Sequence, residues 1–155
     1  MQSIQSLISE LEKDFPKLNF VESDKFLWSP TKMTVFFDPN SQYCHEYTLH
    51  ELSHAILGHQ NYIQDIELLK LERDAWNYAR NNMAKNYDVI IDDDTIQDNL
   101  DTYRDWLYAR STCPVCETTG IEKKTQQYKC LACGHDWIAN EARLCALRRY
   151  SGQTK

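Results

Sequence analysis

The sequence lacks any apolar segment that approaches the roughly 18 to 20 residues needed to cross a lipid bilayer. Its first residues, MQSIQSLISELEKDF, have neither the basic start nor the small-residue cleavage site of a secretory signal. Internal repeats and low-complexity segments are also absent. These absences argue against a membrane-spanning, secreted or repeat protein, and we expect a cytoplasmic protein.

What is present suffices for one ordinary domain, or for a core of about 110 residues with a small module attached. The 155 residues carry a net charge of -6, which is unevenly distributed. Residues 1–110 contain 10 Lys and Arg against 19 Asp and Glu, whereas residues 111–155 contain 7 against 4. An acidic body and a basic C-terminal region indicate two units with different partners.

Apolar periodicity predicts an α+β fold, mostly helical with a small β-sheet. We expect helices over residues 3–14, 41–57 or 46–57, 63–85 and 92–107. Gly58 marks the end of the second helix. The segment KMTVFFDP (32–39) predicts a strand, because Met33, Val35 and Phe37 recur at every second position and β-branched and aromatic residues dominate. The run Asp92-Asp93-Asp94 could bind a metal, but acidic runs more often cap a helix, and we expect a cap.

The segment YTLHELSHAILGH (47–59) contains His50, Glu51 and His54 in an HExxH arrangement. Residues four apart lie on one face of a helix, so both imidazoles can point at one cation. Glu51 lies about 100° round the helix from His50, where it can reach a metal-bound water without ligating the metal. The core-facing side is expected to consist of Leu49, Leu52 and Ile56.

A catalytic metal needs a third protein ligand. In one class of zinc peptidase this is a histidine six residues after the second, but here that position is Gln60. His59 arrives one residue early, and we expect it at the helix end, where the helix dipole favours it.

The next helix offers two carboxylates, Glu67 and Glu72. We favour Glu72, because Ala75 and Ala79 allow two helices to approach closely, and we expect Glu67 on a solvated face. Asp74 could be a hydrogen-bond partner of a ligating histidine.

These residues resemble the ImmA/IrrE family of metallopeptidases, which are related to the glutamate zincins. The resemblance is carried by YTLHELSH (47–54) and ERDAWNYA (72–79), and it covers about residues 30–85. The family pattern is roughly F-T-L-x-H-E-L-x-H followed by E-x-x-A-x-x-F-A. Here the extra residue before the first histidine is missing, and Tyr78 stands where Phe is usual.

The resemblance implies a zincin-like metallopeptidase domain with His50, His54 and Glu72 as zinc ligands and Glu51 as general base. Family members cleave helix-turn-helix repressors. It therefore implies a zinc-dependent endopeptidase whose protein substrate is a transcriptional repressor or another regulatory protein.

Zinc in such a site polarises the scissile carbonyl and lowers the pKa of its water to about 7. Glu51 would take the proton and return it to the leaving amine. The strand MTVFFD (33–38) could pair with an extended substrate, and the alternative is an ordinary core strand. No oxyanion donor stands out among the candidates Tyr43, His45, His59 and Tyr62.

Four of the six cysteines form two CxxC pairs, Cys113/Cys116 and Cys130/Cys133, separated by 13 residues. Two such pairs predict a closed tetrahedral site of four thiolates, and hence a zinc ribbon with a structural zinc. We therefore predict a metallopeptidase domain over 1–110, and a ribbon with a C-terminal tail over 111–155. Cys44 and Cys145 are expected to be small buried residues.

The ribbon region could bind nucleic acid or dock a protein. Its basic residues are Lys123, Lys124, Lys129, Arg143, Arg148 and Arg149. Tyr128 and Trp137 could stack on bases or could fill the core of the ribbon, and the core role is favoured.

Two rival functions remain. The order of an HExxH domain and a four-cysteine ribbon is similar to the SprT-like proteases, which act on DNA-bound proteins. Their third ligand is a later histidine, but this chain has none between His59 and His135. The second rival is a non-catalytic zinc module that binds nucleic acid or protein, although the intact Glu51 argues against it.

Overall fold

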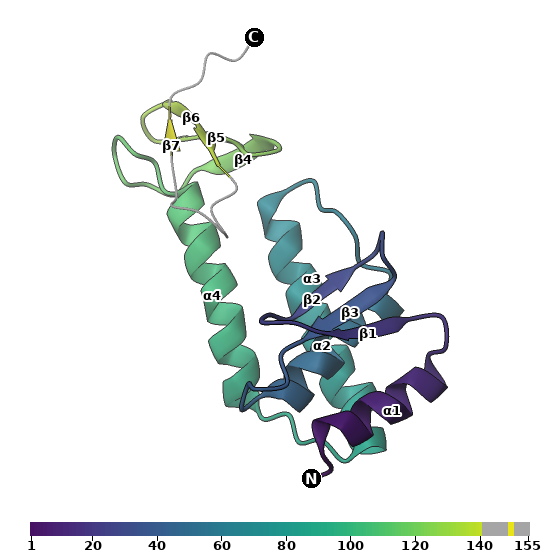
Figure 1. The fold of residues 1–155 in the computed structure, drawn as a ribbon. Coiled ribbons are helices and arrows are strands. Elements are labelled where there is room, and N and C mark those ends of the chain that lie inside the picture. The colour runs from purple at the N-terminus through teal and green to yellow at the C-terminus, as the bar shows by residue number, and fades with distance from the viewer. Residues whose placement is uncertain (141–148, 151–155) are drawn as a thin grey trace. The chain divides into compact units, whose positions relative to one another are not determined.

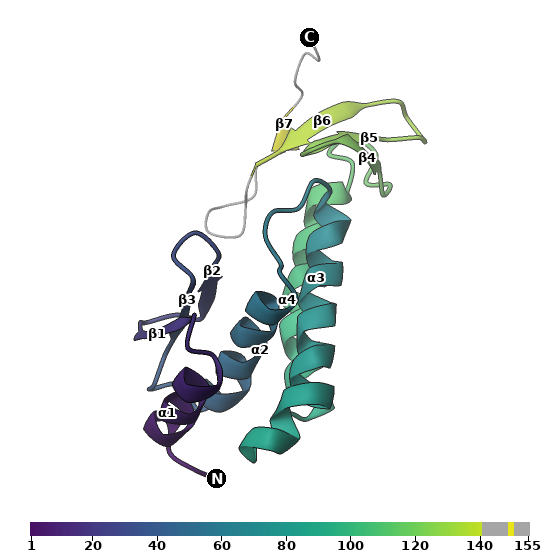
Figure 2. The same ribbon diagram turned by 90° about the vertical axis from the view of Figure 1, so that its right-hand side faces the viewer.

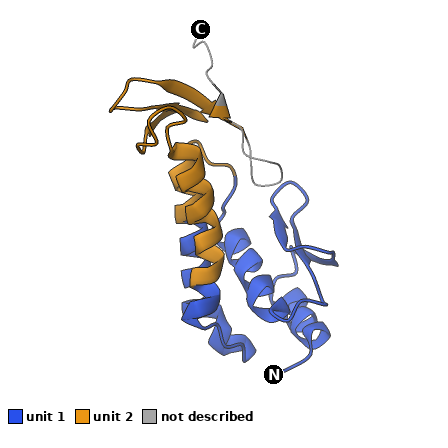
Figure 3. Ribbon diagram, turned by 90° about the vertical axis from the view of Figure 1, so that its left-hand side faces the viewer, with its two compact units in different colours: residues 1–60, 71–96 blue, residues 61–70, 97–155 orange. Residues whose placement is uncertain are grey.

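The computed structural model describes residues 1–140 and 149–150, and the chain has the α+β class expected from its sequence (Figure 1). It forms two compact units (Figure 3). Unit 1 comprises residues 1–60 and 71–96, and unit 2 comprises residues 61–70 and 97–155. Among the described helices, none combines the length and the apolar character needed to cross a membrane.

Unit 1 contains a small sheet and several helices. Its elements are α1 (Ile4–Asp14), β1 (Asn19–Glu22), β2 (Leu27–Ser29), β3 (Thr34–Phe37), α2 (Cys44–Ile56), the π-helical turn η1 (Ala79–Met83) and the 3₁₀ helix η2 (Ala84–Tyr87). The helix expected near the N-terminus is confirmed as α1, which begins where the Ser3 side chain accepts a hydrogen bond from the Ser6 N–H.

The strand expected from KMTVFFDP is β3, and it lies at the centre of the sheet. The strand order is β1-β3-β2, with β1 parallel and β2 antiparallel to β3. Because β3 already has a neighbour on each side, it cannot pair with a substrate, and that expectation is wrong. Helix α2 packs against β3 and β2 (Figure 2), so the sheet supports the helix that carries HExxH.

Helix α2 ends as predicted, before Gly58. Gly58 has a φ of 69°, in the left-handed region. Its N–H bonds to the Ala55 carbonyl at 3.2 Å, and the His59 N–H bonds to the His54 carbonyl at 3.0 Å. These two bonds form a Schellman motif. Ile56, expected in the core, is 36% exposed in the last turn, so the buried face ends earlier than predicted.

The helix predicted over 63–85 is divided in the structure. Helix α3 (Asp65–Tyr78) begins in unit 2 and ends in unit 1, where η1 and η2 follow it. Its buried face starts at Asp65 and Leu68, whereas Ile66 is 53% exposed. Asp65 thus occupies the buried position at the start of the helix, whereas apolar periodicity predicts Ile66 there.

Unit 2 contains the four-cysteine module (residues 111–140) and parts of two helices. Its elements are most of α4 (Asp93–Ser111), β4 (Ile121–Lys124), β5 (Gln127–Lys129), β6 (Asp136–Ala139) and β7 (Arg149–Tyr150). The strands form an antiparallel sheet in the order β4-β5-β6-β7. The acidic run before α4 caps it as expected, because Asp92 accepts the Thr95 N–H at 2.7 Å.

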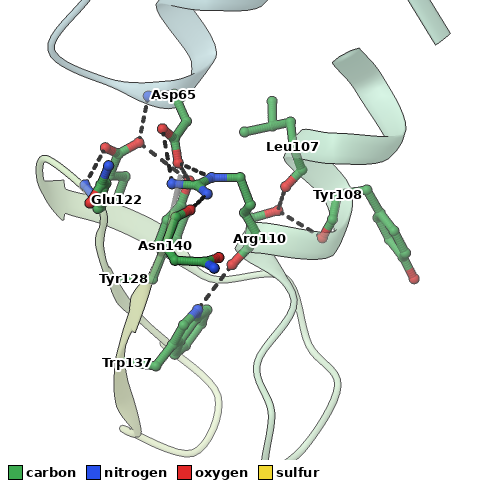
Figure 4. A network of polar contacts seen from close by, with 10 residues as sticks. Asp65, Leu107, Tyr108, Arg110, Glu122, Tyr128, Trp137 and Asn140 are labelled. Atoms are coloured by element: carbon green, nitrogen blue, oxygen red, sulfur yellow. Dashed lines mark hydrogen bonds and ion pairs between the residues drawn. The ribbon is translucent and has the colours of Figure 1, made fainter. Parts of the chain in front are cut away.

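A buried polar network connects the first turn of α3, the last turn of α4 and the four-cysteine module (Figure 4). Arg110 Nε donates to Asp65 Oδ2 at 2.8 Å, and the Tyr128 hydroxyl donates to the same carboxylate. The Trp137 indole donates to the Arg110 carbonyl at 2.9 Å. This network lies within unit 2, which includes residues 97–111 of α4, whereas the sequence-based division puts its boundary after residue 110.

Candidate metal centres

The first candidate centre is built on α2. His50 and His54 lie one turn apart and are 2% and 8% exposed. Their Nε2 atoms are 3.2 Å apart. Both rings therefore direct the same nitrogen toward one point, as residues four apart on a helix can.

Glu72 reaches the same point from α3. Its Oε2 lies 2.9 Å from His50 Nε2 and 3.4 Å from His54 Nε2. Burial raises the pKa of Glu72, but hydrogen bonds with the two histidines outweigh burial and hold that pKa well below its ordinary value. The carboxylate is therefore charged, which is the form that binds a cation. Glu67, the other candidate, accepts the main-chain N–H groups of Ile63 and Gln64.

The atoms offered by His50, His54 and Glu72 fit a single ion. They all lie within 4.8 Å of one another. Tetrahedral ligands at about 2.0 to 2.1 Å from zinc are about 3.3 Å apart. The separations observed here, from 2.9 to 3.4 Å, match that spacing. This group could hold a metal ion.

Glu51 lies beside this group without belonging to it. Its Oε1 is 4.0 Å from His50 Nε2, and its Oε2 accepts the Trp28 main-chain N–H at 2.8 Å. Trp28 lies in β2, and this bond shows that its N–H points away from β3. The edge strand thus fixes a carboxylate next to the candidate centre.

A stacked aromatic ring contacts His50. The Trp76 ring stacks on it, with centroids 4.1 Å apart and an interplanar angle of 19°. Trp76 is fully buried and meets Tyr47 edge-on at 5.2 Å. His50 Nδ1 is buried and has no hydrogen-bond partner among the described residues. Stacking against Trp76 and the 2.9 Å contact of Nε2 with Glu72 Oε2 together orient His50.

His54 is held differently, by His59. Their Nδ1 atoms are 2.9 Å apart. Burial and the neighbouring His54 lower the pKa of His59, which favours its neutral ring. Asp74, which the sequence suggested as a partner, pairs with Arg73 at 3.3 Å.

The sequence did not predict these supporting roles of Trp28, Trp76 and His59. The available signal was Gly58, because a glycine that ends a helix in a Schellman motif folds the next residue back over the last turn. Of the oxyanion candidates, His45 directs Nε2 to the Gln2 carbonyl at 2.9 Å, which leaves that nitrogen occupied.

The second candidate centre consists of the four cysteines. Cys113 and Cys133 have their sulfurs 3.7 Å apart, and those of Cys116 and Cys130 are 3.4 Å apart. These separations are far too long for disulfides and close to the roughly 3.8 Å expected between thiolates on one tetrahedral zinc. This group, too, could hold a metal ion.

The thiol groups of this site shift one another's pKa values in opposite directions. Hydrogen bonds at Thr118 lower the pKa of the Cys116 thiol to about 6. A main-chain hydrogen bond at His135 lowers the pKa of Cys133, but burial and the other thiols outweigh it and raise that pKa to about 12. Four thiolates cannot collect here unless a positive charge offsets them.

Tyr128 and Trp137 are 3% and 1% exposed and stack on each other. They fill the core of the module, so neither ring is available to a base. Gly120 makes room for this core, because a Cβ at that position would lie 2.3 Å from the Trp137 ring. Cys44 is buried as expected. Cys145, Arg143 and Arg148 lie outside the described residues.

Comparison with known proteins identifies no relative of this chain. No protein-family model matches the chain, and searches of curated proteins and of solved structures return no significant match.

Proposed function

We propose that this chain is a zinc-dependent endopeptidase, with His50, His54 and Glu72 as ligands of a catalytic zinc and Glu51 as general base. The observation that carries the proposal is the convergence of two Nε2 atoms and a charged carboxylate, with a second carboxylate adjacent to them. Zinc bound there would act as a Lewis acid toward the scissile carbonyl and activate a water molecule.

The contacts of Glu51 support a role in proton transfer. The Trp28 N–H holds its Oε2, and its Oε1 faces the ligand cluster. In this position Glu51 takes a proton from the attacking water and delivers it to the leaving amine nitrogen. Peptide hydrolysis needs both transfers, and one carboxylate can perform them in turn.

The edge of β2 suits an extended peptide. β2 pairs with β3 on one side, and on its other side no strand of the described part of the chain pairs with it. The Trp28 N–H on this side is already donated to Glu51, so a substrate strand added here would use the other main-chain groups of the edge and would run past Glu51 and the metal ligands. We propose β2, in place of β3, as the substrate-binding strand, and the resemblance described above favours a repressor or another regulatory protein as substrate.

The four-cysteine module would hold a second, structural zinc in a zinc-ribbon arrangement. Its ligands fill all four positions, so no position remains for substrate or water. About 30 residues bury too little apolar surface to fold alone, and metal binding would supply much of the stability.

The test compares the wild-type chain with Glu51→Gln. A peptide library from a digested proteome is incubated with each protein, and new N-termini are counted by mass spectrometry. Wild type should cleave peptides internally. Glu51→Gln should lose at least about 100-fold in rate, since the proton transfer is removed, and should keep its zinc content. Cleavage that survives in Glu51→Gln, or a zinc-loaded wild type that cleaves nothing, contradicts the proposal.

A further inference from the structure

His54 uses its two ring nitrogens in different directions. Nε2 faces His50 Nε2 at 3.2 Å and Glu72 Oε2 at 3.4 Å. Nδ1 lies 2.9 Å from Nδ1 of His59, and the two rings meet at 65° with centroids 5.1 Å apart. A metal bound at Nε2 therefore leaves Nδ1 to His59.

The direction of the His54–His59 hydrogen bond follows from this arrangement. A neutral imidazole carries one N–H, and a nitrogen that ligates a metal carries none. With His54 Nε2 as a ligand, the proton of His54 sits on Nδ1 and is donated to His59. His59 Nδ1 must then be the acceptor, which places the proton of His59 on its Nε2.

The fold holds His59 in place from two sides. The Schellman bond from the His59 N–H to the His54 carbonyl, at 3.0 Å, folds residue 59 over the last turn of α2. From β2, the Trp28 indole donates to the His59 carbonyl at 3.2 Å. The side-chain bond to His54 is thus formed by a residue whose main chain is already fixed.

We propose that His59 is a positioning residue of the His50–His54–Glu72 centre, which holds His54 in the tautomer and ring orientation that metal binding requires. The inference rests on the proposed function only in taking this group as a metal centre. His59 is not a ligand, because its Nδ1 contacts the nitrogen of His54 that points away from Glu72. Loss of an acceptor behind a ligating histidine typically weakens metal binding roughly 10- to 100-fold.

A purely structural role at the helix end predicts a different outcome. In that case any replacement of His59 would lower the stability of the zinc-free protein, and the acceptor atom would not matter. The replacements must therefore differ in the acceptor. Phe keeps a ring of similar size without an acceptor, whereas Asn can place Oδ1 where Nδ1 was.

The experiment uses the full chain as wild type, His59→Phe and His59→Asn. Affinity for zinc at the histidine centre is measured by competition with a chromophoric chelator that leaves the cysteine-bound zinc in place. His59→Phe should bind zinc roughly 10- to 100-fold more weakly, and His59→Asn should stay closer to wild type. Co²⁺ bound at the same centre should show a shifted visible absorption band in His59→Phe alone.

Two outcomes overturn the proposal. One is wild-type zinc affinity in His59→Phe. The other is equal weakening in both variants, together with an equal drop in the urea midpoint of the zinc-free protein. Because zinc itself is the probe, cleavage that survives in Glu51→Gln would refute the peptidase and leave this result standing.

Discussion

The Trp76 ring stacks on His50 and helps to orient it, together with the contact of His50 Nε2 with Glu72. We predict that Trp76→Leu weakens zinc binding at the histidine centre and lowers the free energy of unfolding by about 3 kcal/mol, because the stack is lost and a cavity forms. Trp76→Phe keeps an aromatic face against His50, so it should lose stability but retain most of the affinity. Urea unfolding and chelator competition measure the two effects, and equal zinc affinity in Trp76→Leu and wild type would contradict the role of the stack.

Site residues that share one helix face are easier to predict from the sequence than site residues that packing brings together. His50, Glu51 and His54 follow from spacing on one helix. Glu72 is harder to predict, because two carboxylates were available on the next helix and close helix packing was the argument for choosing between them. Trp76 follows apolar periodicity like any core residue, and nothing in that pattern distinguishes a ring stacked on an imidazole from a ring packed on leucine.

At the scale of elements, the C-terminal end of α2 at Gly58 positions His59 beside the metal centre. Gly58 has a φ of 69°, where a Cβ is strained even though no atom beyond its chain neighbours would lie within 4 Å of it. We predict that Gly58→Ala lowers the free energy of unfolding by about 1 to 2 kcal/mol. The same change should weaken zinc binding, because it displaces His59.

Gly58→Asn is the matched control, since asparagine tolerates the left-handed conformation better than alanine. It should lie between wild type and Gly58→Ala in both stability and zinc affinity. If Gly58→Ala unfolds more easily but binds zinc as tightly as wild type, the helix end does not support the metal centre.

Elements with strong local patterns were predictable, and elements defined by their partners were not. Helix α1 and strand β3 have clear periodicity, and both are present where expected. Strands β1 and β2 have only four and three residues, and their existence depends on pairing with β3. Considered without those partners, β3 resembles a strand with a free edge, whereas in the structure both of its edges are paired.

At the scale of the whole molecule, unit 2 depends on a buried ion pair. Asp65 and Arg110 are each 1% exposed, and together they join two helix ends to the four-cysteine module. Asp65→Asn leaves the Arg110 charge without its partner, so we predict a loss of about 3 to 5 kcal/mol in the stability of unit 2. Hydrogen exchange over residues 121–139 reports this loss.

Asp101→Asn is the control for Asp65→Asn, because Asp101 pairs with Arg104 on the surface, and its side chain is 61% exposed. It should change stability by less than about 1 kcal/mol. If the two variants exchange alike over residues 121–139, the buried pair does not hold unit 2 together.

The two candidate centres lie in separate compact units and differ in how many ligands the protein supplies. Three ligands leave a coordination position open to a chelator, whereas four thiolates close the site, so the metals should leave in order. We predict two zinc ions per wild-type chain by elemental analysis, of which 1,10-phenanthroline removes one quickly.

His54→Ala should contain one slowly released zinc, and hydrogen exchange over residues 121–139 should match wild type. Cys130→Ser should keep the quickly released zinc and lose protection over residues 121–139, because metal binding supplies much of the folding free energy of that module. A wild-type chain with a single zinc, bound by the cysteines, would leave the histidine centre without its metal and exclude the peptidase.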